Sequence, residues 1–236
     1  MNKSALYKVW QEDWGNYYKN PNIPSDHKLR AEVLKIFGGK LNGKKVLEVG
    51  AGSGMDLTSL VKIGAIGYAL DFSENSLRVC QKIAKIQNVE IETVVADARR
   101  IPFRESYFDL VYSVGLIEHY KNPVLFLRDQ VRVLKKGGYL IVDVPQKYNL
   151  YTLVKRYRMR HGSFRFGWET EYSKNDLKLL AFKLKLDTIG FYGRGSAFTL
   201  KFPPALRNGW VSILDYFQNT KLAPYVCLNI GIICQK

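Results

Sequence analysis

Short β-branched runs alternate with longer helical patterns between Lys44 and Pro145, and this alternation constrains the fold more than any other feature of the chain. Repeated strand–helix–strand units build a mostly parallel sheet with helices on both faces. The predicted strands are apolar almost throughout, as expected for strands covered on both faces. The sequence therefore predicts an α/β fold with a doubly wound sheet. The predicted strands are KVLEVG, AIGYALD, VEIETVVAD, FDLVYSVG and GYLIVDVP.

The length of 236 residues and the hydrophobic content of 47% suit one sizeable core rather than two full domains. We expect a single domain over residues 1–236 with four parts. Residues 1–43 are predicted to form a helical lid rich in aromatic side chains, and residues 44–145 the ligand-binding core. A basic, aromatic insertion spans 146–172, and a C-terminal helix and strands over 173–236 complete the sheet.

Charge and cysteine content narrow the function classes. No apolar run is long enough to cross a bilayer and no secretion signal is recognisable, so a cytoplasmic location is expected. The spacing of Cys80, Cys227 and Cys234 indicates buried thiols, with neither a disulfide framework nor a metal site. A net charge of +15 attracts nucleic acid, acidic metabolites or an anionic membrane, and the charge alone does not choose among them.

A glycine-rich turn follows the first predicted strand, in VLEVGAGSG. Ligands bind beyond the carboxyl ends of strands in open α/β sheets, where glycines at 50, 52 and 54 leave backbone N–H groups accessible. Asp71 ends the next strand at the spacing where a carboxylate meets ribose hydroxyls. A dinucleotide site requires glycine or alanine at position 55, where this chain has Met55. These residues favour a nucleoside ligand other than a dinucleotide.

Five successive segments, VLEVGAGSG, ALDFSENSL, VVADARRIPF, FDLVYSVGLIEHY and VLKKGGYLIVDVP, resemble the motifs of the class I S-adenosylmethionine-dependent methyltransferases. The resemblance covers roughly residues 40 to 195 and is strongest to the branch that often methylates small molecules, lipids or sugars. It implies a Rossmann-like sheet of seven strands, six parallel and one antiparallel. S-adenosylmethionine would lie across the carboxyl edge of this sheet.

The resemblance also implies which residues contact the cofactor. Glu48 and the neighbouring turn would face its methionine portion, Asp71 its ribose and Phe72 its adenine ring, while Asp97 would accept from the adenine N6 amino group. From the lid, Tyr17 or Tyr18 would reach the methionine carboxylate. The full predicted cofactor-binding set is Glu48, Gly50, Ala51, Gly52, Gly54, Asp71, Phe72, Ser73, Asp97, Ala98, Ser113, Val114, Gly115 and Tyr17.

Methyl transfer is an in-line displacement at a carbon activated by the positive sulfur, so the protein mainly aligns the nucleophile and excludes water. A general base is optional, and it helps if the acceptor is a hydroxyl. Glu118 and His119, just past the fourth strand, are the best placed candidates. His119 alternatively caps the following helix or lines the cofactor site.

The turn at the end of the fourth strand narrows the choice of acceptor. Ser113-Val114-Gly115-Leu116 stands where related enzymes for base amino groups have an Asp/Asn-Pro-Pro-aromatic turn, so such an acceptor is disfavoured. Residues 147–168 contain six Lys or Arg, no acid and several aromatics. This stretch fits a solvated face, a clamp for an anionic substrate, a segment at an anionic membrane surface or a stacking surface for RNA.

Together these features predict a methyltransferase that uses S-adenosylmethionine and modifies an oxygen or nitrogen of a small-molecule, lipid-linked or sugar-linked acceptor, with the acceptor carrying negative charge. The alternative is an RNA methyltransferase, which the basic composition favours and the fourth-strand motif disfavours. A non-catalytic S-adenosylmethionine-binding module ranks below both, because Asp71, Asp97 and the turn glycines are all present.

Overall fold

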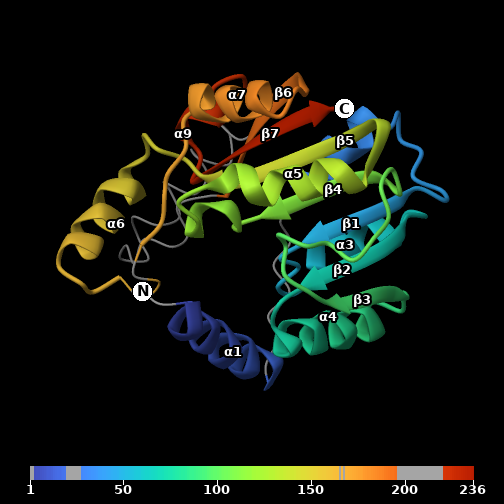
Figure 1. Ribbon diagram of the computed structural model, residues 1–236, viewed down its shortest axis with the longest axis horizontal. Helices are drawn as coiled ribbons and strands as arrows, with labels where there is room; N and C mark the ends of the chain where they lie inside the picture. Colours follow the sequence, from blue (N-terminus) through green and yellow to red (C-terminus); the bar gives the residue numbers. More distant parts are fainter. Residues whose placement is uncertain (1–2, 20–27, 165, 167, 196–219) are drawn as a thin grey trace.

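The computed structural model of the chain describes residues 3–19, 28–164, 166, 168–195 and 220–236. Seven strands in this part form one sheet with the order β3-β2-β1-β4-β5-β7-β6 (Figure 1). Only β7 runs antiparallel to its neighbours β5 and β6, so the predicted doubly wound sheet with one antiparallel strand is confirmed. The strands are β1 Lys45–Val49, β2 Ile66–Asp71, β3 Ile91–Val95, β4 Phe108–Val114, β5 Leu134–Pro145, β6 Asp187–Arg194 and β7 Asn229–Gln235.

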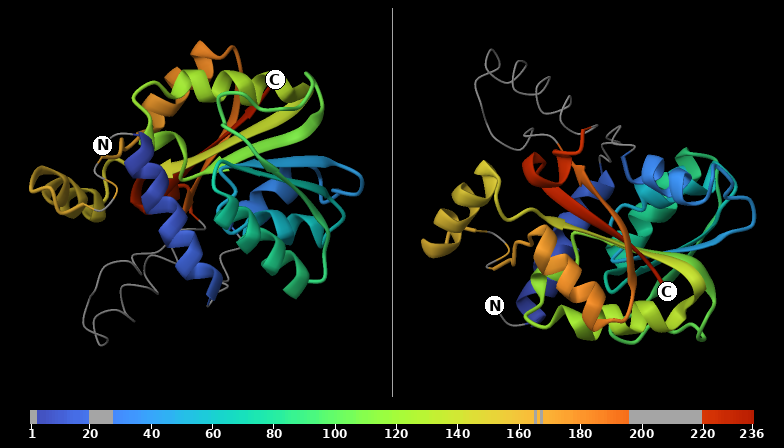
Figure 2. Two further views of the ribbon diagram at one scale, coloured as in Figure 1. Left: turned by 60° about the horizontal axis from the view of Figure 1, so that its bottom comes forward. Right: turned by 90° about the horizontal axis from the view of Figure 1, so that it is seen from above.

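Helices cover both faces of this sheet (Figure 2). Their bounds are α1 Lys3–Lys19, α2 Lys28–Ile36, α3 Met55–Val61, α4 Glu74–Ile86, α5 Pro123–Val133, α6 Leu150–Arg160, α7 Lys174–Lys183 and α9 Ala223–Val226, with a 3₁₀ turn, η1, over Ile117–His119. None of the described helices is long and apolar enough to span a bilayer.

The core has two halves because successive strand residues point to opposite faces. Leu47 packs with the apolar residues of α5 and α7, whereas its neighbour Val46 packs with those of α2, α3 and α4. This double coverage explains why the strands read as continuous apolar runs rather than as alternating ones.

Local sequence signals place the two helices that follow the binding-site strands. The Ser73 hydroxyl accepts from the Ser76 backbone N–H and caps α4, as its position before an amphipathic run predicts. Gly54 precedes α3 with φ at 66°, and a Cβ there would lie 2.6 Å from the Cys80 sulfur. Glycine at this position therefore lets α3 and α4 approach each other closely.

The segments outside the central sheet gather near its carboxyl edge. Helix α1 packs against α4, where the Asn75 amide donates to the Gln11 carbonyl at 3.0 Å. Helix α6 follows β5 and stands out at one side of the molecule, apart from the sheet (Figures 1 and 2). The insertion expected over 146–172 thus contains a helix, which Asn149 caps by accepting from the Thr152 N–H.

Candidate active site

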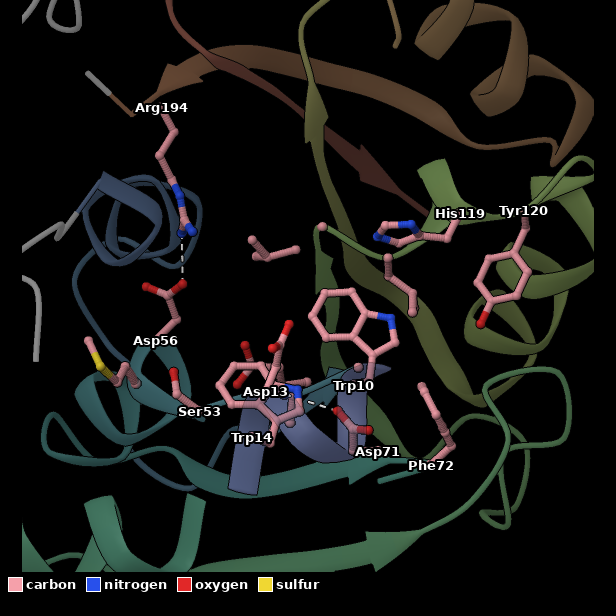
Figure 3. Close-up of a pocket in the computed structure, with 18 residues that line it drawn as sticks. Trp10, Asp13, Trp14, Ser53, Asp56, Asp71, Phe72, His119, Tyr120 and Arg194 are labelled. Carbon is pink, nitrogen blue, oxygen red and sulfur yellow. Dashed lines mark hydrogen bonds and ion pairs between the residues drawn. The ribbon is translucent and has the colours of Figure 1, made fainter. Parts of the chain in front are cut away.

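A cavity of about 660 Å³ lies at the carboxyl ends of β1, β2 and β4 (Figure 3). Its volume is in the range of small-molecule and cofactor sites. The cavity is lined by Trp10, Asp13, Trp14, Glu48, Gly50, Ala51, Gly52, Ser53, Met55, Asp56, Asp71, Phe72, Val114, Gly115, Leu116, His119, Tyr120 and Arg194.

Asp71 holds the glycine turn in place from the end of β2. Its two carboxylate oxygens accept from the backbone N–H groups of Gly52, at 3.0 Å, and Ser73, at 2.8 Å. Burial raises the pKa of Asp71, and these backbone hydrogen bonds oppose the rise because they favour the charged form. The carboxylate thereby ties the β1 turn to the β2 turn at the cavity wall.

Glu48, in β1, brings a second carboxyl group to the cavity. The side chain is buried, and its Oε2 atom has no hydrogen-bond partner among the described residues. Burial raises the pKa of Glu48 well above its usual value, and the charge of Asp56 adds to the rise. A buried carboxyl oxygen without a partner is costly, so this atom is suited to receive an N–H donor from a ligand.

Arg194, at the end of β6, lines the cavity beside the start of α3. Its guanidinium lies 2.7 Å from the Asp56 carboxylate, the contact drawn as a dashed line in Figure 3, and 3.8 Å from Asp143. These contacts join the C-terminal part of the sheet to the start of α3. The sequence offered one signal for Arg194, a charged residue at the carboxyl end of a strand, and the predicted site did not include it.

Helix α1 closes one side of the cavity with two tryptophans. A Cβ on Gly52 would lie 2.8 Å from the Trp14 ring, so this indole rests directly on the glycine turn. Trp10 stacks on Phe166 with ring centroids 4.8 Å apart and meets His119 edge-on at 5.6 Å. The side chain of Tyr17, which was predicted to reach the cofactor, lies outside the described residues.

The two candidate bases differ in position and in protonation. His119 lines the cavity, whereas Glu118 does not. Burial, reinforced by the charge of Lys155, lowers the pKa of His119 to about 4, so its imidazole is neutral at pH 7. Burial raises the pKa of Glu118 to about 8, and the charge of Glu169 contributes to the rise, so this carboxyl is largely protonated at the same pH.

A buried ion-pair network lies behind His119. Lys155, on α6, is 1% exposed and contacts Glu169 at 3.0 Å and Glu171 at 3.4 Å. Glu169 in turn lies 3.9 Å from His119 Nε2, and the Thr170 N–H donates to the Glu118 carbonyl at 2.9 Å. The insertion is therefore attached to the turn that carries both candidate bases.

This network also changes the interpretation of the basic stretch. Lys155 and Arg156 both contact acids that follow the stretch, because Arg156 lies 3.3 Å from Glu171. Lys155 is buried in this pairing whereas Arg156 is half-exposed, and neither side chain lines the cavity. The pairing was not predicted from the sequence because the acids begin at position 169, just after the acid-free run.

The predicted site residues divide into two groups. Asp97 is outside the lining and pairs with the Arg99 side chain, whose Nε donates to it at 2.8 Å, so its contact with adenine stays a prediction. The residues brought to the cavity are Glu48, Gly50, Ala51, Gly52, Asp71, Phe72, Val114, Gly115 and His119. Those outside the lining are Gly54, Ser73, Asp97, Ala98, Ser113 and Glu118.

Residues 47–142, which contain the glycine turn, Asp71 and the turn with His119, match the family described as a methyltransferase domain. This part of the chain is a class I S-adenosylmethionine-dependent methyltransferase domain. For this family, S-adenosylmethionine is the implied methyl donor. The site fits that molecule, because the unpartnered Glu48 oxygen suits its ammonium group and Asp71 lies at the strand end where a ribose is held.

Two relatives show which methyltransferases are similar in sequence. The chain is 35% identical over 114 residues to a ubiquinone biosynthesis O-methyltransferase of Shewanella sp. strain ANA-3, covering 48% of this chain and 48% of that protein. It is 34% identical over 148 residues to a demethylmenaquinone methyltransferase of Staphylococcus aureus strain MRSA252, covering 59% and 60%. The match thus spans about half the length of these curated relatives.

Solved methyltransferase structures share the fold at low sequence identity. A methyltransferase from Aquifex aeolicus superposes with a TM-score of 0.61 at 17% identity, covering 93% of this chain and 97% of that chain. One from Archaeoglobus fulgidus gives a TM-score of 0.60 at 16% identity, covering 89% and 94%. At this identity the likeness establishes the arrangement of the methyltransferase sheet and its helices alone.

Proposed function

We propose that this chain transfers a methyl group from S-adenosylmethionine to an oxygen of a small, lipid-linked acceptor that carries a hydroxylated aromatic ring. The observation that carries the proposal is the wall of the cavity that Trp10 and His119 form. There the neutral imidazole of His119 meets, edge-on, the rings of Trp10 and Phe166, which stack on each other. Aromatic walls suit a flat ring, and a neutral imidazole suits an acceptor that loses a proton.

The cofactor-binding roles follow from the residues at the strand ends. When bound, S-adenosylmethionine supplies a methyl group on a positively charged sulfur. The Glu48 carboxylate would receive its ammonium group, and Asp71 its ribose hydroxyls. Val114 and Gly115 would line the space beside the sulfur, while Trp14 covers the glycine turn and keeps water out.

His119 would act as the general base for the acceptor hydroxyl. Its low pKa keeps the imidazole unprotonated at neutral pH, so it can accept the proton, as a weaker base than a solvated histidine. The positive charge that the ring then gains lies 3.9 Å from Glu169. Lys155 holds Glu169 in position, which makes Glu169 a positioning residue that stabilises the protonated ring.

The charges around the cavity favour an acceptor that is neutral where it enters. Among the described residues, four acids line the cavity, Asp13, Glu48, Asp56 and Asp71, against a single arginine. That arginine, Arg194, already contacts Asp56 and Asp143. The basic stretch led us to expect an acceptor with negative charge. That charge would therefore lie on a part of the acceptor away from its reacting ring.

The names of the relatives support the acceptor class. One is named for O-methylation in ubiquinone biosynthesis and the other for methylation of demethylmenaquinone. An isoprenoid ring compound fits an aromatic-walled cavity with a neutral base. RNA remains the second candidate acceptor because the net charge is +15.

The test is transfer of labelled methyl from S-adenosylmethionine to a short-tailed hydroxylated quinol precursor, with tRNA as the competing acceptor. We expect label in the quinol fraction, and His119→Asn to lower kcat by about 10²- to 10⁴-fold with little change in cofactor affinity by calorimetry. His161→Asn is the matched control, because His161 is exposed and contacts the carbonyl of Tyr157 in its own helix.

Three results would contradict the proposal. Label found only in RNA would establish the second candidate. Full activity of the His119→Asn variant would show that His119 is not the general base. Binding of S-adenosylmethionine without label in any acceptor fraction would indicate a binding module without catalysis.

A further inference from the structure

We propose that the outward face of α6 docks on an anionic membrane surface. The surface is made up of Leu153 and Tyr157 at its centre and of Arg156, Arg158 and Arg160 at its edges; we call it the α6 surface. This inference goes beyond the proposed function, because it concerns where the protein acts and is measured without any methyl transfer.

The position of α6 makes its outer face available to a large partner. Figure 1 and both views of Figure 2 show the helix standing out at one side, away from the sheet. Leu153 and Tyr157 lie one helical turn apart and are 61% and 64% exposed. Thr152 and Lys155 are buried on the opposite side, so the helix has a distinct inner and outer face.

The arginines surround this apolar centre. With 3.6 residues per turn, Arg156 and Arg160 fall on one side of the line through Leu153 and Tyr157, and Arg158 falls on the other. All three arginines are exposed, Arg156 while in contact with Glu171, and α6 contains no acidic residue. Apolar side chains flanked by arginines are typical of helices that lie in the interface of an anionic bilayer.

Exposed aromatic side chains also lie in the segments before and after α6. Tyr148, just before α6, and Trp168, after it, are both exposed aromatic residues. Tyrosine and tryptophan are favoured at membrane interfaces because one end of each ring is apolar and the other polar. The α6 surface therefore has neighbours that suit the same partner.

A membrane suits this face better than RNA does. Proteins that bind single-stranded RNA stack bases on aromatic rings along a basic groove. Here the outer face belongs to a projecting helix, and an aliphatic side chain, Leu153, shares its centre. Leucine offers no ring for base stacking but gains free energy by entering an apolar layer.

The placement also suits delivery of a lipid-linked acceptor. Helix α6 follows β5 and leaves the sheet at the carboxyl edge, where the cavity lies. The segment after α6 reaches the cavity wall, because Phe166 stacks on Trp10 and meets His119 edge-on. A membrane held at α6 would present its lipids on the side of the molecule that contains the site.

The experiment is co-sedimentation of the full chain with vesicles of phosphatidylcholine alone or with about one-third phosphatidylglycerol. We expect binding to the anionic vesicles only. The double variant Arg158→Gln, Arg160→Gln is expected to lower the partition coefficient about 25-fold, from about fivefold per arginine. Leu153→Ser with Tyr157→Ser is expected to lower it by about tenfold or more.

An exposed apolar patch on α7 provides the matched control, because α7 packs against β6 and β7 and contains the acid Asp176. Leu179 and Phe182 are 52% and 79% exposed and are flanked by Lys178 and Lys183. We expect Leu179→Ser with Phe182→Ser to leave vesicle binding unchanged, and circular dichroism to show that all variants are folded.

Three outcomes would overturn the proposal. The first is no binding of the wild-type protein to anionic vesicles. The second is binding that the α6 variants retain or that the α7 variant loses instead. The third is salt-sensitive binding to tRNA that the arginine variants abolish, without vesicle binding, which would make the α6 surface an RNA contact. None of these outcomes depends on turnover, so a failure here is distinct from a failure of the proposed methyl transfer.

Discussion

Replacing Glu118 with glutamine tests the electrostatics behind His119. Glu118 is buried, and its Oε2 atom has no hydrogen-bond partner among the described residues. Ionisation there would leave a charge with little solvation, which is why its pKa is raised to about 8. Glutamine has nearly the shape of the protonated carboxyl group and does not ionise. We therefore expect Glu118→Gln to be the more stable protein at neutral and alkaline pH.

The sign and size of the effect follow from proton linkage. The folded-state pKa of Glu118, about 8, is above its ordinary value of 4.5, so the folded protein binds more protons between these pH values. The stability of the wild-type protein therefore falls as pH rises through this range. At about 1.4 kcal/mol per pKa unit, the loss reaches about 3 kcal/mol at pH 7. Below pH 4.5 both proteins carry a neutral group, and the difference vanishes.

The assay is urea unfolding of the two proteins at about pH 5 and at about pH 8. The difference in unfolding free energy between the two proteins reports the titration of Glu118, because the other groups titrate in both proteins. His119 is one of these, and its contribution has the opposite sign. Its folded pKa of about 4 is below its ordinary 6.5, so its stabilising contribution is present above pH 6.5 and is lost as pH falls.

The control is Glu105→Gln, which removes an exposed carboxylate and measures the effect of net charge alone. Parallel stability curves for wild type and Glu118→Gln across this pH range would refute the reasoning. They would mean that Glu118 is solvated in the folded protein and carries its charge at neutral pH.

Three further predictions concern residues around the cavity. Lys155→Met removes the buried cation facing Glu169 and is expected to cost about 3–5 kcal/mol in urea unfolding, whereas the half-exposed Arg156→Gln should cost less than about 1 kcal/mol. Gly52→Ala places a Cβ against the Trp14 ring at a φ of 54°, and we expect a loss of about 1–3 kcal/mol that Trp14→Ala partly restores. Asp71→Ala should weaken S-adenosylmethionine binding by about 2–3 kcal/mol in calorimetry. Unchanged affinity would show that Asp71 does not bind the ribose.

The part of the cavity around the glycine turn was predictable because its residues stand at the ends of predicted strands. Once KVLEVG and AIGYALD are parallel neighbours, the glycine turn and Asp71 must meet at one edge of the sheet. Short-range chemistry then fixes the details, as when the carboxylate of Asp71 accepts from the N–H groups of Gly52 and Ser73. Asp97 shows the limit of this reasoning, because its carboxylate pairs with Arg99, two residues further along the chain.

The part of the cavity around Trp10 and His119 was not predictable in the same way. Its walls come from α1 and from the turn with His119, and Phe166, after α6, packs behind them; these segments are distant in sequence and share no sheet register. The contacts of Trp10 with Phe166, and of Lys155 with Glu169, arise from tertiary packing that no periodic pattern encodes. Composition was misleading here, because Lys155 counts as one of six exposed-looking cations in 147–168 yet is buried.

The two faces of α6 have separate roles. One contacts the ion pairs behind His119, and the other faces solvent. The inner face carries Lys155, whose contact with Glu169 fixes the position of the acid behind His119. The outer face carries Leu153 and Tyr157, which point away from the body of the protein. A helix of three turns is rigid. Binding at its outer face therefore affects Glu169 only if the whole helix moves. Substitutions on the outer face should therefore change access of a membrane-held acceptor while activity on a water-soluble acceptor stays the same.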